Sequence, residues 1–279
     1  MTGKHVPLAG VIGHPVGHSL SPVLHGHWLR TLGLRGHYVP LDVAPADLAA
    51  VLAALPRAGF VGANVTIPHK EAARDLADRL TERAARIGAV NTLTFSRDGE
   101  VTGDCTDGAG FIANLRDGVP GWTAASGPVA VFGAGGAARA IVDALIADGA
   151  PEVRIANRTR ARAEALAELA DDGRVRVADW KAAADIVDGA ATVVNTTALG
   201  MAGQPPFAID LAALSPGTVA TDIVYAPLET PFLAAARARG ARCVDGLGML
   251  LHQAVPGFEA WFGQRPEVTP ALRDAVLAA

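Results

Sequence analysis

Short runs of apolar, often β-branched residues alternate along the chain with longer Ala/Leu-rich segments of helical period. This alternation is typical of an α/β protein with mostly parallel strands, because a helix usually carries the chain back between two parallel neighbours. In the first third, the pattern predicts strands at 6–12, 37–43 and 62–66 and helices at 22–31, 45–55 and 70–76. Further strands at 91–95 and 100–102 flank the turn 97–99, which predicts a hairpin and therefore one antiparallel strand.

A Gly/Pro-rich stretch at 117–128 follows a predicted helix at 107–115 and is the candidate domain boundary. Beyond this stretch, a second series of alternating strands and helices is predicted. Its strands are predicted at 129–132, 152–156, 175–177, 192–195, 219–223 and 242–244, and its helices at 136–147 and 159–170. Two final helices are predicted at 248–262 and 270–277, the first kinked or broken at Pro256.

Composition narrows the class of protein. A chain of 279 residues suits two domains of ordinary size, each able to bury its own core. Hydrophobic residues make up 50% and charged residues 19%, which excludes a largely disordered chain. A formal charge of −4, without any block of Lys or Arg, argues against a nucleic-acid partner. No apolar run reaches membrane-spanning length, and the apolar segment 6–16 is too interrupted by Gly and Pro for a signal peptide.

Cysteine and histidine positions give no sign of a metal site. Cys105 and Cys243 lie far apart without a C-x-x-C spacing, so we expect reduced thiols in a cytoplasmic protein. The eight histidines include no i, i+4 pair beside a glutamate. We therefore expect no metal.

The segment from Gly62 to Glu71 places a lysine where a cation is electrostatically unfavourable. A strand ends at Thr66, Pro68 suits the first position of a helix, and a helical pattern follows from Lys70. The unpaired N–H groups of a helix N-terminus destabilise a nearby ammonium, which should lower the pKa of Lys70. A lysine of this kind is a candidate for proton transfer; the alternative is a solvated surface lysine.

A glycine-rich loop follows the predicted strand 129–132. Its sequence, Gly133-Ala134-Gly135-Gly136-Ala137-Ala138, fits the dinucleotide pattern G-x-G-x-x-G/A at the start of a helix. Gly133 would make the turn, Gly135 would let the backbone approach a pyrophosphate, and Ala138 would allow close helix–strand packing. A merely structural turn is the alternative, but strand, loop and helix occur in the order that a dinucleotide site needs.

The next strand ends at Asn157-Arg158-Thr159, where a dinucleotide site meets the adenosine ribose. An NAD site would normally place Asp or Glu there, whereas Arg158 offers a planar cation for the 2′-phosphate of NADP. Thr159 could bind that phosphate as it caps the next helix, and Arg162 lies on the same side of the first turn. NADP is therefore the predicted cofactor; the alternative is a capped helix with two solvated arginines.

These motifs together resemble shikimate dehydrogenase. The resemblance extends over nearly the whole chain, through the segments 13–22, 64–70, 88–92, 105–108, 133–138, 157–159, 222–225 and 245–253. It implies a cytoplasmic enzyme of aromatic amino-acid synthesis that reduces 3-dehydroshikimate to shikimate with NADPH. It also implies an α/β substrate domain at 1–116, completed by 247–279, and a Rossmann NADP-binding domain at 117–246. One departure is Cys105, where the family commonly has Asn; we expect little functional cost.

The resemblance assigns residues to the substrate. Ser19 and Ser21 would hold the carboxylate, which their i, i+2 spacing in an extended segment permits, although Ser21 could instead be the N-cap before Pro22. Thr66 and Asn91, with Asn64 nearby, would bind ring hydroxyls; buried backbone caps are the alternative.

Proton transfer and further substrate contacts follow from the same resemblance. Asp107 would hydrogen-bond a substrate hydroxyl beside Lys70, and this pair suits proton transfer at a carbonyl that accepts hydride. The alternative for Asp107 is a cap on the following helix. Tyr225 and Gln253 carry over as further substrate contacts, although a core tyrosine and a solvated glutamine are the default interpretations.

For the cofactor, Ile223 and Gly246 would line the nicotinamide, and Glu82 is a weaker assignment to the same region. A quinate- or aminoshikimate-type dehydrogenase and a non-catalytic NADP-binding sensor remain alternatives. The sequence leaves monomer and homodimer both open.

Overall fold

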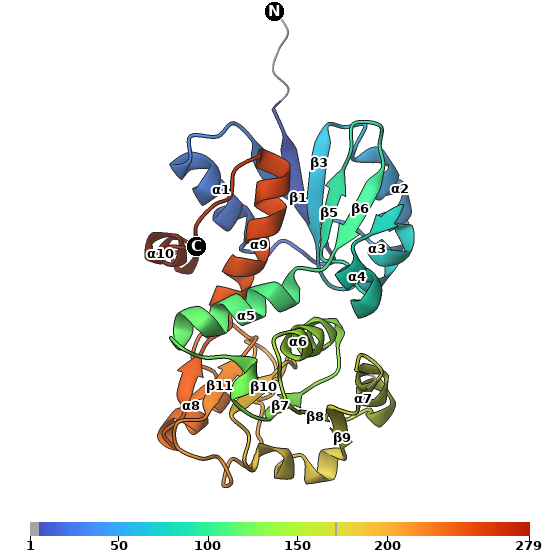
Figure 1. The fold of residues 1–279 in the computed structure, drawn as a ribbon. Coiled ribbons are helices and arrows are strands. Elements are labelled where there is room, and N and C mark those ends of the chain that lie inside the picture. Colours follow the sequence, from blue (N-terminus) through green and yellow to red (C-terminus); the bar gives the residue numbers. More distant parts are fainter. Residues whose placement is uncertain (1–5, 171) are drawn as a thin grey trace, which may run out of the picture. The chain divides into compact units, whose positions relative to one another are not determined.

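The structure, a computed structural model, describes residues 6–170 and 172–279. The chain divides into two compact units. Unit 1 comprises the chain up to Thr106 together with Gln253–Ala279, and unit 2 comprises Asp107–His252 (Figure 1). Each unit is built around a six-stranded sheet, which confirms the predicted two-domain α/β class.

The sheet of unit 1 has the order β2-β1-β3-β5-β6-β4. Its strands are β1 (Leu8–Gly13), β2 (His37–Asp42), β3 (Phe60–Val65), β4 (Arg79–Leu80), β5 (Thr92–Phe95) and β6 (Val101–Asp104). Strand β1 runs parallel to β2 and β3, whereas β5 is antiparallel to both β3 and β6. The predicted hairpin is thus confirmed. Because β5 is antiparallel to β3, its first residues lie at the edge of the sheet where β3 ends.

Helices cover both faces of this sheet (Figure 1). They are α1 (Ser21–Thr31), α2 (Leu48–Ala54), α3 (Lys70–Leu76), α4 (Glu82–Ile87), the C-terminal part of α9 (Leu247–Phe262) and α10 (Pro270–Leu277). Trp261 of α9 packs in a buried cluster with Ala9, Val11 and Tyr38 of the sheet. The returning C-terminal helix therefore completes the core of unit 1.

The sheet of unit 2 has the order β12-β11-β10-β7-β8-β9, and every neighbouring pair is parallel. Its strands are β7 (Val129–Phe132), β8 (Val153–Ala156), β9 (Val175–Ala178), β10 (Thr192–Asn195), β11 (Val219–Asp222) and β12 (Arg242–Val244). This is the doubly wound Rossmann order, in which strands are added to one side of β7 and then, from β10 on, to the other side. Ligands of such sheets bind at that point, outside the carboxyl ends of the strands.

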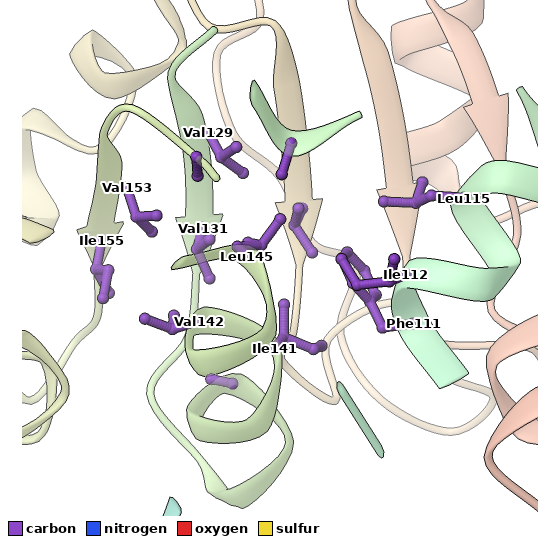
Figure 2. Packing of buried hydrophobic residues seen from close by; sticks show 14 of the residues in the cluster. Phe111, Ile112, Leu115, Val129, Val131, Ile141, Val142, Leu145, Val153 and Ile155 are labelled. Atoms are coloured by element: carbon purple, nitrogen blue, oxygen red, sulfur yellow. The ribbon is translucent and has the colours of Figure 1, made fainter. Parts of the chain in front are cut away.

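In the strands of unit 2, the side chains of successive residues point to opposite faces of the sheet. Val129 and Val131 of β7 join the cluster formed with α5 (Asp107–Gly118) and α6 (Gly136–Ala147), which Figure 2 shows around Ile141 and Leu145. Ala130 and Phe132 join the opposite cluster, which includes residues of α8 (Pro231–Ala238). Helix α7 (Arg160–Ala167) lies between β8 and β9 in sequence. Both faces of the central strand β7 are buried, so its sequence, Val129-Ala130-Val131-Phe132, is a continuous apolar run.

Four details differ from the sequence expectations. Helix α9 is continuous through Pro256, so it is not broken there, and a kink at Pro256 stays a prediction. Buried residues of its flanking turns, Leu251 and Phe258 among them, hold the helix together across the missing N–H. Pro68 is not the first helical residue: it lies in a turn ahead of His69, which is the N-cap of α3.

Ser21 is not an N-cap either, because it is the first residue of α1 and its side chain makes no capping bond. The last difference concerns α5, which groups with unit 2, as do residues 247–252. The reason is close packing on α6: a Cβ on Gly108 would lie 2.3 Å from the carbonyl oxygen of Ala140. The assignment of residues 1–116 and 247–279 to substrate binding stays a prediction. So does the assignment of residues 117–246 to NADP binding.

Candidate active site

Residues proposed for substrate binding gather at one edge of the sheet in unit 1. Ser19 and Ser21 follow the carboxyl end of β1, and Asn64 and Thr66 lie at the carboxyl end of the neighbouring parallel strand β3. Asn91 immediately precedes β5, whose first residue pairs with Asn64 in the ladder. The fold therefore brings together residues that are distant in sequence.

The two serines are linked to each other. The Ser21 backbone N–H donates to the Ser19 hydroxyl oxygen at 3.3 Å. This bond gives Ser19 a local role in shaping the loop, and it uses the oxygen only as an acceptor, so the hydroxyl proton remains available for a carboxylate. Ser21 is buried and Ser19 is partly exposed.

Lys70 is the first residue of α3, and its side chain is partly exposed. Its carbonyl oxygen accepts from the Val90 N–H at 2.9 Å, which ties the start of the helix to the segment that leads into Asn91. Preceding it, the His69 ring is buried and its Nε2 lies 2.7 Å from the Val43 carbonyl oxygen. The position in the first helical turn is the one that the sequence predicts.

A buried network holds Asn91 and Gln253. The Asn91 side chain accepts from the Thr106 N–H at 2.8 Å and donates to Gln253 Oε1 at 3.0 Å. Thr106 also donates its hydroxyl to the Gln253 carbonyl oxygen at 2.8 Å. Gln253 is therefore buried and bonded rather than solvated, and it reaches the same sheet edge as Asn91.

Asp107 and Tyr225 belong to unit 2. Asp107 directly follows Thr106 of the network, begins α5 and is buried. Tyr225 lies in the loop after β11 and is partly exposed, and burial raises its pKa. Asn64 and Asn91 do take part in buried bonds, as the alternative interpretation expected. The substrate roles of all these residues remain predictions.

The glycine loop has the local geometry of a phosphate-binding turn. Gly133 has a positive φ of 111°, and a Cβ there would lie 2.5 Å from Thr196 Oγ1 at the end of β10. Gly135 and Gly136 face open space, with no atom within 4 Å of an added Cβ. Ala138 is fully buried at the helix–strand contact. Ala134 and Ala137, both partly exposed, complete a loop whose backbone is accessible at the start of α6.

Two arginines at the end of β8 are available to a ligand. Arg158 and Arg162 are exposed and form no ion pair within the described parts of the chain. Arg160, between them, pairs with Glu164 at 2.8 Å and Asp179 at 2.6 Å. Thr159 is the N-cap of α7, but its side chain makes no capping bond, so its hydroxyl is also available. Asn157 fixes this turn by donating to the Thr159 carbonyl oxygen at 2.8 Å.

The accessible glycine backbone and the two unpaired arginines fit a phosphorylated dinucleotide. The loop offers N–H groups to a pyrophosphate, and the arginines offer charge to a 2′-phosphate.

Ile223 and Gly246 lie together near the carboxyl ends of the strands in this sheet. A Cβ on Gly246 would lie 2.4 Å from the Ile223 carbonyl oxygen, so a larger residue is excluded at position 246. Glu82 is exposed in the first turn of α4, in unit 1, and its cofactor role stays a prediction.

Sequence reasoning missed several residues that organise these sites. Tyr38, Thr92 and Thr106 join Asn64 and Asn91 in one network. Thr92 and Thr106 lay within motifs but had no role assigned, and Tyr38 lay in no motif. In unit 2, the Asp222 carboxylate accepts from Asn195 Nδ2 at 3.0 Å and from the Thr230 hydroxyl at 2.8 Å. Burial raises the pKa of Asp222. A polar residue at the end of an otherwise apolar strand was the available signal for Asn195 and Asp222.

Among the described residues, no group of three or more His, Cys, Asp or Glu side chains is arranged to hold a metal ion. No helix in the described part of the chain is both long and apolar enough to cross a membrane.

Comparison with known families gives three consecutive matches. The shikimate dehydrogenase substrate binding domain matches residues 11–93, the shikimate / quinate 5-dehydrogenase domain matches residues 122–201, and the shikimate 5'-dehydrogenase C-terminal domain matches residues 246–277. The matches cover most of the sheet of unit 1 but not β6, the first four strands of unit 2 and the C-terminal helices.

Relatives and solved structures agree with these matches. Shikimate dehydrogenases (NADP(+)) from Cereibacter sphaeroides and Paracoccus denitrificans are each 62% identical, over 98% and 99% of this chain and 98% of each relative. Shikimate 5-dehydrogenase from Thermus thermophilus, in complex with NADP(H) and shikimate, superposes with a TM-score of 0.86 at 38% identity, covering 97% of this chain and 98% of that one.

Quinate dehydrogenase from Corynebacterium glutamicum, in complex with NAD, gives a TM-score of 0.91 at 33% identity, covering 99% of this chain and 100% of that one. Solved structures with this fold thus include enzymes named for shikimate and for quinate, in complexes with NADP(H) and with NAD. The identity over nearly the full length decides the assignment: the chain belongs to the shikimate dehydrogenase family.

Proposed function

We propose that this chain is an NADP-dependent shikimate dehydrogenase that reversibly reduces 3-dehydroshikimate to shikimate in aromatic amino-acid biosynthesis. The observation that carries the proposal is 62% identity, over 98% of the chain, to a relative named for this activity. The two unpaired arginines beside Thr159 support the choice of NADP over NAD.

In this proposal the substrate is held by unit 1. The Ser19 and Ser21 hydroxyls donate to its carboxylate, and Thr66, Asn91 and Gln253 bind ring hydroxyls. Thr66 is suited to this because its hydroxyl makes no hydrogen bond to the described residues, whereas its backbone is fixed by bonds to Ile12 and His69. Tyr225 adds a contact from unit 2.

The cofactor is held by the residues of unit 2. Backbone N–H groups of the loop 133–137 bind the pyrophosphate, while Arg158, Thr159 and Arg162 bind the 2′-phosphate and Asn157 shapes their turn. Ile223 and Gly246 line the nicotinamide. When bound, NADPH supplies the hydride. We keep Glu82 as a weaker cofactor assignment.

Lys70 is the proposed proton-transfer residue. In the direction of reduction, its ammonium gives a proton to the C3 carbonyl oxygen of 3-dehydroshikimate, and in the reverse direction its amine removes the hydroxyl proton. Asp107 hydrogen-bonds the neighbouring hydroxyl and stabilises the charged lysine. The helix N-terminus at Lys70 lowers the cost of losing that proton.

A quinate dehydrogenase activity is the second candidate, because the quinate enzyme of Corynebacterium glutamicum has a closely similar fold. Steady-state oxidation of shikimate and quinate, each with NADP and NAD, separates the two. We expect the highest kcat/KM for shikimate with NADP. A preference for quinate or NAD would overturn the assignment, and no turnover of either substrate would indicate the non-catalytic sensor.

We further propose a cytoplasmic location and a monomer or homodimer. Neither cysteine forms a disulfide with another described residue, as suits a reducing compartment. Sedimentation velocity at micromolar concentration would distinguish the two assembly states.

A further inference from the structure

A buried chain of hydrogen bonds leads from Tyr38 to Asn91, a residue that the proposed function places on the substrate. The Tyr38 hydroxyl donates to Asn64 Oδ1 at 2.7 Å. Asn64 Nδ2 donates to the Thr92 hydroxyl at 3.3 Å, and that hydroxyl donates to Asn91 Oδ1 at 3.1 Å. All four side chains are buried. Each donor in this series has an acceptor, so the hydrogen bonds all run in one direction, from Tyr38 to Asn91.

These bonds fix the orientation of the Asn64 amide. Asn64 Nδ2 also donates to the Asn91 carbonyl oxygen at 3.2 Å, and a carbonyl oxygen only accepts. The amino group must therefore face Asn91, which turns Oδ1 toward the Tyr38 hydroxyl. Both N–H bonds of the Asn64 amide are then occupied by protein acceptors.

Tyr38 is itself held in place. Its ring stacks on His25 with centroids 3.9 Å apart and an interplanar angle of 3°, and Trp261 lies beside it at 6.1 Å. Burial raises the pKa of Tyr38 well above its usual value, so the hydroxyl keeps its proton and remains a donor. The rigid ring therefore presents one donor at a fixed place, against Asn64.

We infer that Tyr38 is a positioning residue for the substrate: through Asn64 and Thr92 it holds the Asn91 side chain in its binding orientation. This inference rests on the proposed function. In this role Asn64 supports Asn91. Losing one link of a buried chain should lower kcat/KM for shikimate about three- to tenfold, the usual range for a single neutral hydrogen bond.

The test is Tyr38→Phe, which removes only the hydroxyl and keeps the ring on His25. We expect KM for shikimate to rise and KM for NADP to stay unchanged. Trp28→Phe is the matched control, because Trp28 packs against His25 in the same cluster and donates a partly buried bond to the Glu267 carbonyl oxygen at 2.9 Å. This control should lower stability toward urea and leave KM for shikimate unchanged.

A double-mutant cycle shows whether Tyr38 acts through Asn64. In an Asn64→Ala background, Tyr38→Phe should change KM for shikimate less than it does in the wild type. Thr92→Val, which breaks the next link at nearly constant volume, should reproduce the effect of Tyr38→Phe.

Three results would overturn the inference: an unchanged KM in Tyr38→Phe, an equal change with and without Asn64, or an equal rise in Trp28→Phe. If the wild-type protein did not oxidise shikimate with NADP, the proposed function would fail and the positioning role with it. An active wild type whose KM is insensitive to Tyr38→Phe would refute the positioning role alone.

Discussion

His25 provides a quantitative test of how unit 1 is packed. Its side chain is fully buried among Trp28, Tyr38, Phe258 and Trp261, and neither ring nitrogen has a hydrogen-bond partner among the described residues. Burial lowers the pKa of His25 from 6.5 to about 3, although the nearby Asn64 amide raises it in part. The imidazole is therefore neutral in the folded protein at any ordinary pH.

The sign and size of the consequence follow from proton linkage. Between pH 6.5 and about 3 the unfolded chain binds a proton at His25 that the folded chain does not. The free energy of unfolding must therefore fall as pH falls below 6.5. From pH 7.5 to pH 5 this one residue should remove about 2 kcal/mol. The pKa of His25 in the folded protein lies far below 5. The predicted loss of about 2 kcal/mol therefore depends almost entirely on the pKa of His25 in the unfolded chain.

The perturbation is His25→Leu, which fills the same apolar site without a titratable group. Urea unfolding followed by tryptophan fluorescence is a suitable assay, because Trp28 and Trp261 flank His25. The variant should lose about 2 kcal/mol less than the wild type between pH 7.5 and pH 5. His27→Leu, which removes a partly exposed histidine from the same helix, is the matched control. Equal pH dependence in His25→Leu and wild type would refute the argument.

Two further predictions concern the proposed ligand contacts. Arg158→Asp should raise KM for NADP at least about tenfold, because charge-assisted bonds worth roughly 1.5–3 kcal/mol are lost and repulsion is added. Arg160→Asp makes the same charge change two residues away, at an arginine already paired with acidic side chains, and should raise it much less; similar KM values in the two variants would contradict the 2′-phosphate site. Ser19→Ala should raise KM for shikimate with little change in KM for NADP or in melting temperature. A destabilised variant with a normal KM would instead make Ser19 a loop-shaping residue, as its bond from the Ser21 N–H allows.

Most of the fold was predictable because the apolar pattern and the glycine loop act locally. The strand 129–132, the helix 136–147 and the final helix 270–277 have the predicted bounds. Short elements were harder. Strand β4 has two residues and was not predicted, and the helix at 231–238 was missed although Thr230-Pro231 is a good helix start. Helix α9 continues through Pro256 because of tertiary packing, whereas the rule that proline interrupts a helix considers only the local sequence.

The candidate site was predictable only where motifs carried it. Lys70, the glycine loop and Arg158 each stand in a recognisable local context. The chain from Tyr38 through Asn64 and Thr92 to Asn91 joins residues of three strands and a connecting loop. Its existence depends on strand order and register, so the sequence offered no signal for Tyr38. The pairing of Arg160 with Asp179 likewise became visible only when β9 was placed beside β8.

The proposed mechanism requires that this chain oxidises shikimate with NADP and that Lys70 moves the proton. Both requirements are tested by kcat for shikimate oxidation at saturating NADP, measured for the wild type and Lys70→Met in parallel. We expect a readily measured wild-type kcat and a decrease of about 10²–10⁴ in the variant, the usual loss for a general acid or base. Substrate affinity should be affected less, because Ser19, Ser21 and Asn91 remain in place. A near-normal kcat in Lys70→Met, or a defect confined to KM, would contradict the mechanism.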